Sequence, residues 1–396
     1  MAMKIKELRV TVRDIVQGYV DYSDSDEGIF GYGGKLNIRP KYQRNYVYDE
    51  EKRNAVIDTV SKNYPLGLMY WVKNADGSFE ILDGQQRTIS ICSYVNPDNP
   101  ANGYSVAGLF GNKNPRHFNG LNPTEQKIIL DYPLLVYVCE GDEIDRLQWF
   151  ETINIAGEKL SDQEIRNAHY CCAWLTDAKR YFSKRNSAGQ QLATKPNAYI
   201  KLNANNNWNR QGGLEKVLRW YINDMKDTEK LKAFMSEMKD KSIRQPDWNA
   251  TELWEYFKSV IAWVKTTFPK YRKKMDEVEW GILYNKYHEK PCNVAEIEET
   301  VARLYADDDV TNKAGIYYYI FDGKEKYLHI RQFEDWQKET VYERQNHNCA
   351  DCGQHFEIGE MEAHHKKRWV DGGHTEIDNC VMLCKDCHDK RHNHSD

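Results

Sequence analysis

Two pairs of cysteines near the end of the printed sequence have the spacing of a metal site. Cys349 and Cys352 form one Cys-x-x-Cys pair, and Cys384 and Cys387 form a second one. Such a pair is typical of a turn that presents two thiolates to one tetrahedral zinc ion. Because four thiolates leave no coordination position for water, the sequence predicts a structural Zn²⁺ that stabilises a segment with a small core. Cys380 stands outside both pairs and is expected to pack as a small apolar side chain.

Histidines are concentrated around the same cysteines. Eight of the twelve histidines in the chain lie between His347 and His394. Hydrolysis of a phosphodiester needs a base that activates water and a cation that stabilises charge, and imidazoles can supply the base and hold the ion. Taken alone, these histidines would be read as ordinary surface residues. Within this region stand, in order, His364, His365, Asn379, His388 and His392.

The order of these residues resembles that of the HNH, or ββα-metal, endonucleases. The resemblance implies that His365 is the general base and that Asn379 orients its imidazole across a ββα hairpin. It also implies that His364 and His388 hold a catalytic Mg²⁺, Mn²⁺ or other divalent ion. His392 follows His388 by four residues and would share a helical face with it, either as a third ligand or as a solvated histidine.

A second candidate site lies in the segment ILDGQQRTISI. Gly84 would let backbone N–H groups approach a phosphate, and the guanidinium groups of Arg87 and Arg44 fit phosphate oxygens. Asp83 could hold a magnesium ion or polarise a water molecule. The residues alone favour a plainer interpretation, in which Asp-Gly is a turn after the strand FEIL and Arg87 is a surface charge.

This segment resembles the N-terminal domain of the GmrSD family of modification-dependent restriction enzymes, a relative of the ParB and sulfiredoxin fold. The match rests on DGQQR, on KYQRNYVY upstream, and on WFETINIAGEKLSDQEIRNA, which contains Phe150. It covers residues 5–170 and implies a nucleoside triphosphate site with NTPase activity, while no residue selects one nucleotide. The implied site residues are Asp83, Gly84, Gln85, Gln86, Arg87, Arg44 and Asn154. Tyr42 and Gln43 are divided between this pocket and contact with modified DNA.

Charge along the chain indicates where DNA could be held. The formal charge of the whole chain is −5, and residues 344–396 contain seven Lys or Arg against ten Asp or Glu. Residues 178–220 contain nine Lys or Arg and one acid, so they are the first candidate for a DNA-binding surface, with an ordinary solvated helix face as the equal alternative. The DNA contacts expected there are Lys184, Arg185 and Arg210, with Tyr181, Phe182, Tyr199 and Trp208 interleaved.

The elements that must position these sites change in type along the chain. Residues 1–165 contain β-like runs bounded by Gly, Pro and Asp, namely IRPKYQRNYV, PLGLMYWV, SFEILDG and PLLVYVCEG. FGYGGK is expected to be a hairpin turn. Residues 166–333 are expected to be helical, because apolar residues recur at spacings of three and four, as in Leu214, Val217 and Leu218 and again in Leu253, Phe257 and Val260.

Between the first of these helices, LNANNNWNRQGG is expected to be a surface loop, and RQFEDWQKETVYERQ reads as an amphipathic helix before the cysteines. The sequence therefore predicts an α+β multidomain protein. Its parts are a ParB-like α/β nucleotide-binding domain at 1–165, a helical DNA-holding domain at 166–333, and a small zinc-bound ββα-metal HNH domain at 334–396.

The predicted function is a metal-dependent DNA endonuclease that nicks or cuts. We expect a nucleotide-regulated, modification-dependent restriction enzyme in anti-phage defence, with phosphorothioate, glucosylated or methylated DNA as the open alternatives. No apolar run is long enough for a membrane span and no secretory signal is evident, so a cytoplasmic location is expected. The sequence does not decide whether the protein forms a homo-oligomer.

Two other functions are compatible with the same sequence. One is a nucleotide-binding DNA-recognition protein whose zinc module is not catalytic, and the other is an unspecific HNH nuclease of repair or toxin type. A degenerate module should have lost His365, Asn379 or His388, and all three are present.

Overall fold

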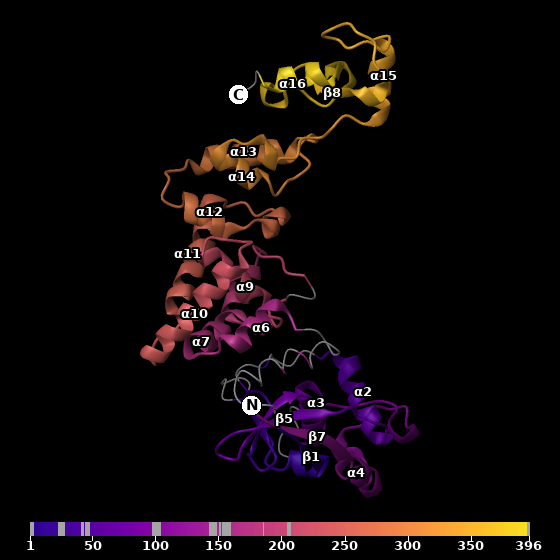
Figure 1. Cartoon of the computed structure of the whole chain (residues 1–396), viewed down its shortest axis with the longest axis vertical. Coiled ribbons are helices and arrows are strands. Elements are labelled where there is room, and N and C mark those ends of the chain that lie inside the picture. The colour runs from indigo at the N-terminus through magenta and orange to yellow at the C-terminus, as the bar shows by residue number, and fades with distance from the viewer. Residues whose placement is uncertain are drawn as a thin grey trace. The chain divides into compact units, whose positions relative to one another are not determined.

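The computed structural model describes residues 4–22, 28–40, 43, 48–96, 104–141, 149, 152, 160–184, 186–203 and 207–393. The chain divides into two compact units, residues 1–193 with 202–258 and residues 194–201 with 259–396 (Figure 1). The boundary differs from those expected at 165 and 333. It falls inside helix α11 (Thr251–Thr267), so the later helices belong to the same unit as the cysteine-rich segment.

A mixed seven-stranded sheet forms the N-terminal part of the first unit, with strand order β1-β7-β5-β6-β4-β3-β2. Strand β5 pairs in parallel with β7 and antiparallel with β6, and these three strands correspond to three of the four expected β-like runs. The strands are β1 (Lys4–Thr11), β2 (Val20–Tyr22), β3 (Gly28–Gly31), β4 (Leu36–Asn37), β5 (Met69–Lys73), β6 (Phe79–Asp83) and β7 (Pro133–Glu140). The helices beside them are α1 (Val12–Val16), α2 (Glu50–Ser61), α3 (Gln85–Val95) and α4 (Pro123–Leu130).

The glycine-rich run FGYGGK forms the β3–β4 hairpin, as expected. Phe30 pairs with Asn37 and Gly31 with Leu36, and residues 32–35 form the turn. The fourth β-like run, IRPKYQRNYV, forms no strand at Ile38–Pro40, and most of its remainder lies outside the described residues. The mixed sheet agrees with an α/β domain, and the ParB-like fold stays a prediction.

Local sequence explains how the helices of this domain begin. Asp49 caps α2 by accepting a hydrogen bond from the N–H of Lys52. Asn122 and Glu125 form a capping box at α4, with Pro123 at its first position. Helix α3 instead begins at Gly84, which has a left-handed φ of 103° and no side chain that could cap the helix.

Gly84 is expected to tolerate alanine poorly. A Cβ at this position would lie 2.8 Å from Cγ of Met69, which is fully buried. We expect Gly84→Ala to lower the free energy of unfolding of the first unit by about 2–4 kcal/mol, through left-handed strain and overpacking. The measurement is a urea titration. Gly77→Ala is the matched control, because Gly77 has a φ of 84° and no atom within 4 Å of its Cβ position. Equal losses in the two variants would contradict the role of Met69.

Helices fill the rest of the first unit, as the apolar spacing predicted. They are α6 (Asp162–His169), α7 (Ala173–Phe182), α8 (Ala188–Thr194), α9 (Gly212–Tyr221), α10 (Thr228–Arg244) and α11. The two predicted apolar stripes are buried, including Leu214, Val217 and Leu218 on α9 and Leu253 and Phe257 on α11. In its described part, the segment LNANNNWNRQGG is a loop up to Gln211.

The second unit carries α12 (Trp280–Tyr287), α13 (Val294–Ala306), α14 (Ile316–Asp322), α15 (Asp335–Arg344), β8 (Met361–His365), β9 (Cys380–Cys384) and α16 (Lys385–Asn393). Helix α15 confirms the one expected before the cysteines. Strands β8 and β9 pair antiparallel and are followed by α16, which confirms the ββα arrangement. Short 3₁₀ helices lie at Leu109–Gly111, Phe118–Gly120, Lys273–Glu277, Glu325–Tyr327, Ile358–Glu360, Trp369–Asp371 and Ile377–Asn379. Within the described ranges, no helix is long and apolar enough to cross a membrane.

Candidate active site and zinc site

The four predicted cysteines converge on one point. The sulfur atoms of Cys349, Cys352, Cys384 and Cys387 all lie within 4.8 Å of one another, and Cys352 Sγ is 3.9 Å from Cys384 Sγ. Tetrahedral zinc with Zn–S bonds of about 2.3 Å places its sulfur ligands about 3.8 Å apart, so these residues fit Zn²⁺. One pair lies on the turn after α15, and the other lies where β9 meets α16.

The surroundings of Cys349 favour its thiolate form. Burial alone would raise its pKa, but backbone N–H groups of Cys352, Cys384 and Asp351 lower the pKa of the Cys349 thiol to about 6. Cys380 is different, because burial raises the pKa of its thiol to about 11. It belongs to the apolar core around the zinc site, as predicted.

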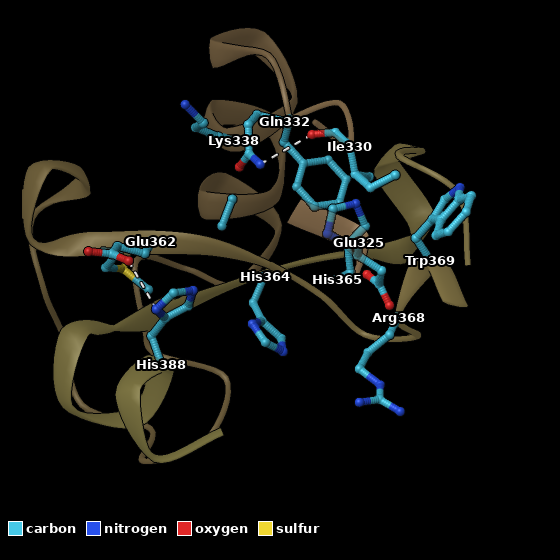
Figure 2. A pocket seen from close by; sticks show the side chains of 13 residues that line it. Glu325, Ile330, Gln332, Lys338, Glu362, His364, His365, Arg368, Trp369 and His388 are labelled. Atoms are coloured by element: carbon cyan, nitrogen blue, oxygen red, sulfur yellow. Dashed lines mark hydrogen bonds and ion pairs between the residues drawn. The ribbon is translucent and has the colours of Figure 1, made fainter. Parts of the chain in front are cut away.

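Strand β8 presents its two adjacent histidines in opposite directions, as neighbouring residues of a strand must. Figure 2 shows His364 and His365 pointing to opposite sides of the strand. The strand is held in register by β9, in which Val381 pairs with His364 and Cys380 with His365. The adjacent His-His sequence thereby gives two imidazoles with different surroundings.

His364 lies close to His388, which belongs to the neighbouring helix α16. Their ring centroids are 5.3 Å apart and the rings are perpendicular. Nδ1 of His388 lies 2.9 Å from a carboxylate oxygen of Glu362 (Figure 2). A carboxylate that accepts from Nδ1–H leaves Nε2 with its lone pair, which is the arrangement found at many histidine-bound metals. Glu362 was missed in the sequence, although its spacing of two residues from His364 places both on one face of β8.

His365 lies on the other side of the strand, half-buried against an aromatic ring. Its ring centroid is 4.3 Å from that of Phe333, and Nε2 lies 3.1 Å from the hydroxyl oxygen of Thr375. That hydroxyl can donate its proton to the carbonyl oxygen of Arg331 at 3.1 Å. A hydroxyl that donates there accepts from His365, so this arrangement favours the proton on Nε2 and the lone pair on Nδ1.

The neutral form of this imidazole is favoured by its environment. Burial lowers the pKa of His365, and the negative charge of Asp309 opposes this effect. A neutral imidazole with a free Nδ1 lone pair is the form that can take a proton from water.

The sequence predicts that Asn379 orients the His365 imidazole, but the Asn379 side chain hydrogen-bonds backbone groups instead. Its side-chain oxygen accepts from the N–H of Lys367, and its NH₂ group donates to the carbonyl oxygens of Lys367 and His374. The amide thus closes the loop between β8 and β9, and Thr375 makes the contact with the imidazole. The reason is that the oxygen and the NH₂ group of this short side chain are already hydrogen-bonded to the loop backbone.

One pocket of 710 Å³ is lined by both histidines of strand β8, His364 and His365. It is lined by Glu362, His364, His365, His388 and Arg368, with Lys338 at its side. Figure 2 shows the side chains of Arg368 and His364 extending to the same side of the ribbon. Arg368 and Lys338 are two cations that the sequence did not single out. His392 lies within α16, and its side chain lies outside the described residues.

In the DGQQR segment the arginine is used within the fold. Arg87 donates to the carbonyl oxygens of Leu66 and Leu68 and to the carboxylate of Asp83, each at 2.9 Å. The prediction that the Arg87 guanidinium binds phosphate is therefore wrong, because this group is hydrogen-bonded within the fold. The backbone before β5 has carbonyl groups that need donors, and Arg87 supplies them from the first turn of α3.

The glutamines near this segment are also buried. Gln43 donates to the carbonyl oxygens of Ile81 and Leu82, while the side-chain oxygen of Gln86 accepts from the N–H of Tyr48. The side-chain NH₂ group of Gln86 donates a hydrogen bond to the side-chain oxygen of Gln85. These contacts draw residues 43 and 48 toward the end of β6. The remaining expected residues of the site, Tyr42, Arg44 and Asn154, lie outside the described residues, as does Phe150 of the family match.

Part of the predicted DNA-binding stretch is buried. Arg210 forms an ion pair with Glu164 at 3.3 Å, and the two side chains are 12% and 3% exposed, so Arg210 is corrected from a DNA contact to a partly buried ion-pair partner. Phe182, Tyr199 and Trp208 are buried core residues, which removes them as a surface for stacking bases. Lys184 is half-buried, and Arg185 lies outside the described residues.

Two family models match the chain. Residues 27–171 match the N-terminal domain of the GmrSD restriction endonuclease, and residues 349–394 match the HNH endonuclease. This order of domains is the one predicted, and together the two matches support a restriction-type nuclease. Comparison with curated proteins and with solved structures gave no match.

Proposed function

From these two domain matches and the geometry of the pocket, we propose that the protein is a metal-dependent DNA endonuclease of restriction type. The observation that carries the proposal is one pocket lined both by His365, which contacts Thr375, and by the His364–His388 pair. Such a site places a base for water and a cation site for phosphate charge along one pocket.

His365 is the residue that receives the proton. In the proposed reaction Nδ1 takes a proton from water, the water oxygen attacks phosphorus, and the bond to the 3′ oxygen breaks, the departing oxygen taking a proton from solvent water. The products are then a 5′-phosphate and a 3′-hydroxyl. Arg368 is proposed to neutralise phosphate charge with the rest of its guanidinium, because it lines the same pocket while its Nε donates to Asp371 at 2.9 Å.

His364 and His388 would hold the ion, with His392 proposed as a third ligand. When bound, a divalent cation stabilises the charge that develops on the phosphate and on the departing oxygen. Glu362 fixes the ring of His388 for this role. Imidazole donors suit Mn²⁺, Ni²⁺ or Co²⁺ better than Mg²⁺, so we propose higher activity with Mn²⁺ than with Mg²⁺ at equal concentration.

Regulation is assigned to the N-terminal domain on the strength of its family match. We propose that this domain makes cleavage depend on DNA modification and on a nucleoside triphosphate, as expected for phage defence. The N-terminus of α3 at Gly84 is the feature of the described residues that suits a phosphate, since helix N-termini favour anions. Because Arg87 is committed to carbonyl groups, the proposed phosphate contacts are backbone N–H groups.

A panel of DNAs tests this regulation. Unmodified plasmid and DNAs carrying phosphorothioate, glucosylated or methylated groups are each digested with Mn²⁺, with and without ATP, GTP, CTP and UTP. We expect cleavage of one modified class over unmodified DNA, and a change in rate with one nucleotide. Equal cleavage of all DNAs under all nucleotides would contradict regulation and favour an unspecific nuclease, while His365→Ala reports separately on the chemistry.

A further inference from the structure

Thr375, which contacts the proposed base, is held by a segment that precedes the HNH match. Its backbone N–H donates to the carboxylate of Asp309 at 3.1 Å. Its hydroxyl donates to the carbonyl oxygen of Arg331 at 3.1 Å. Thr375 is buried and is thus fixed at two atoms by residues 309 and 331, which lie outside residues 349–394.

Asp309 and Arg331 are themselves fixed to each other. The N–H of Arg331 donates to the backbone carbonyl of Asp309 at 2.8 Å, and Val310 and Ile330 form an antiparallel bridge beside them. The N–H of Asn312 continues this pairing to the carbonyl of Leu328 at 3.0 Å. The two anchors of Thr375 therefore come from one paired piece of backbone.

The same segment contacts the β8–β9 loop at two more points. Trp369 donates from its indole N–H to Asp307 at 3.0 Å, and Nδ1 of His374 lies 3.1 Å from Asp309. Ligating atoms of Asp307, Asp309 and His374 lie within 4.8 Å of one another. A metal there would displace these protein donors, whereas docking of the loop uses them all, and docking is the simpler explanation.

We propose that Asp309 is a positioning residue for catalysis, which acts through Thr375 to hold His365 in the orientation and tautomer of a base. This proposal rests on the proposed nuclease function. The chain of contacts runs from the Asp309 carboxylate to the Thr375 N–H, and from the Thr375 hydroxyl to Nε2 of His365. Without Asp309 the backbone N–H of Thr375 loses its acceptor, so Thr375 is held only through its hydroxyl and the imidazole can rotate or exchange tautomers.

The first test replaces Asp309 by alanine and compares it with Asp308→Ala, the exposed neighbour of equal charge. Zinc-loaded full chain is used throughout. We expect Asp309→Ala to lower the single-turnover cleavage rate by about 10- to 100-fold, with zinc content and DNA affinity as in Asp308→Ala. In ¹⁵N spectra of histidine-labelled protein, His365 should show the Nε2–H tautomer in Asp308→Ala and a mixture in Asp309→Ala.

A second pair of variants keeps the test decisive if Asp309→Ala fails to fold. Thr375→Ser retains the hydroxyl and is expected to retain cleavage and tautomer. Thr375→Val removes the hydroxyl at similar volume and is expected to reproduce the Asp309→Ala loss. If both residues act through one contact, the double variant should be little slower than either single one.

The outcomes separate the two proposals. If Asp309→Ala and Thr375→Val keep the Nε2–H tautomer and the cleavage rate of their controls, the positioning role is overturned. If no protein in the set cleaves DNA, including the wild type, the proposed function fails, and the NMR result still decides the positioning role. Multiplicative losses in the double variant would show that Asp309 acts independently of Thr375 and would also overturn it.

Discussion

Replacement of His365 by alanine should lower the rate of DNA cleavage by about 10²- to 10⁴-fold, the range in which general bases contribute. The reason is that the Nδ1 lone pair of His365 is the acceptor proposed for the proton of the attacking water. Its fixed tautomer depends on the contact with Thr375 at 3.1 Å. The measurement is the single-turnover cleavage rate of a duplex with excess enzyme and Mn²⁺.

The control for this variant is His355→Ala. His355 is an exposed histidine of the same cysteine-rich module and lies outside the pocket lining. We expect it to cleave at the wild-type rate, and both variants should bind DNA and zinc as the wild type does. A His365→Ala protein that cleaves as fast as His355→Ala would remove His365 from the reaction.

Cys349→Ser is expected to release zinc and unfold the ββα module, with loss of cleavage below detection. The core of this module is small, since it consists mainly of residues from β8, β9 and α15 and of the cysteines themselves. Zinc binding to such modules is worth about 10–16 kcal/mol, which exceeds what a core of this size supplies. The measurements are zinc content per chain and the thermal unfolding profile.

Cys292→Ser is the matched control, because Cys292 is exposed and lies far along the chain from the zinc ligands. It should retain one zinc per chain and an unchanged unfolding profile. If Cys349→Ser also kept full zinc content and activity, the four-thiolate site would not be the structural centre of the module.

The cluster of four cysteines and the ββα hairpin could be predicted because their signals are local. The two Cys-x-x-Cys pairs each form one turn, and alternation along β8 separates His364 from His365. The helical core could also be predicted, since Leu214 and Val217 on α9, and Leu253 and Phe257 on α11, follow the helical spacing of their own helix and are buried.

Contacts between distant segments could not be predicted. Nothing in the neighbourhood of Asp309 indicates that its carboxylate meets Thr375, and Arg87 gives no sign that it will bond Leu66 and Leu68. Arg210 was read as a surface charge because its partner, Glu164, is remote in sequence. Such pairs are set by how the chain folds back on itself, which a local pattern does not record.

The division of the chain differs for a related reason. A change from strand-like to helical periodicity marks a change of element type, and it need not mark the edge of a compact unit. Helix α11 shows this, since its apolar stripe continues without interruption while the boundary between units falls inside it. The segment at 307–331 was assigned to a middle domain, yet it supports Thr375 in the HNH-like module.

The most direct test of the account is the formation of new DNA ends. Purified full chain is incubated with Mn²⁺ and a panel of unmodified and modified DNAs, and ends are assayed for 5′-phosphate and 3′-hydroxyl groups. If the protein is a metal-dependent nuclease with His365 as its base, the wild type forms such ends on at least one DNA. It forms none with EDTA, and His365→Ala forms none. Absence of new ends on every DNA, or equal numbers of ends from wild type and His365→Ala, would contradict this mechanism.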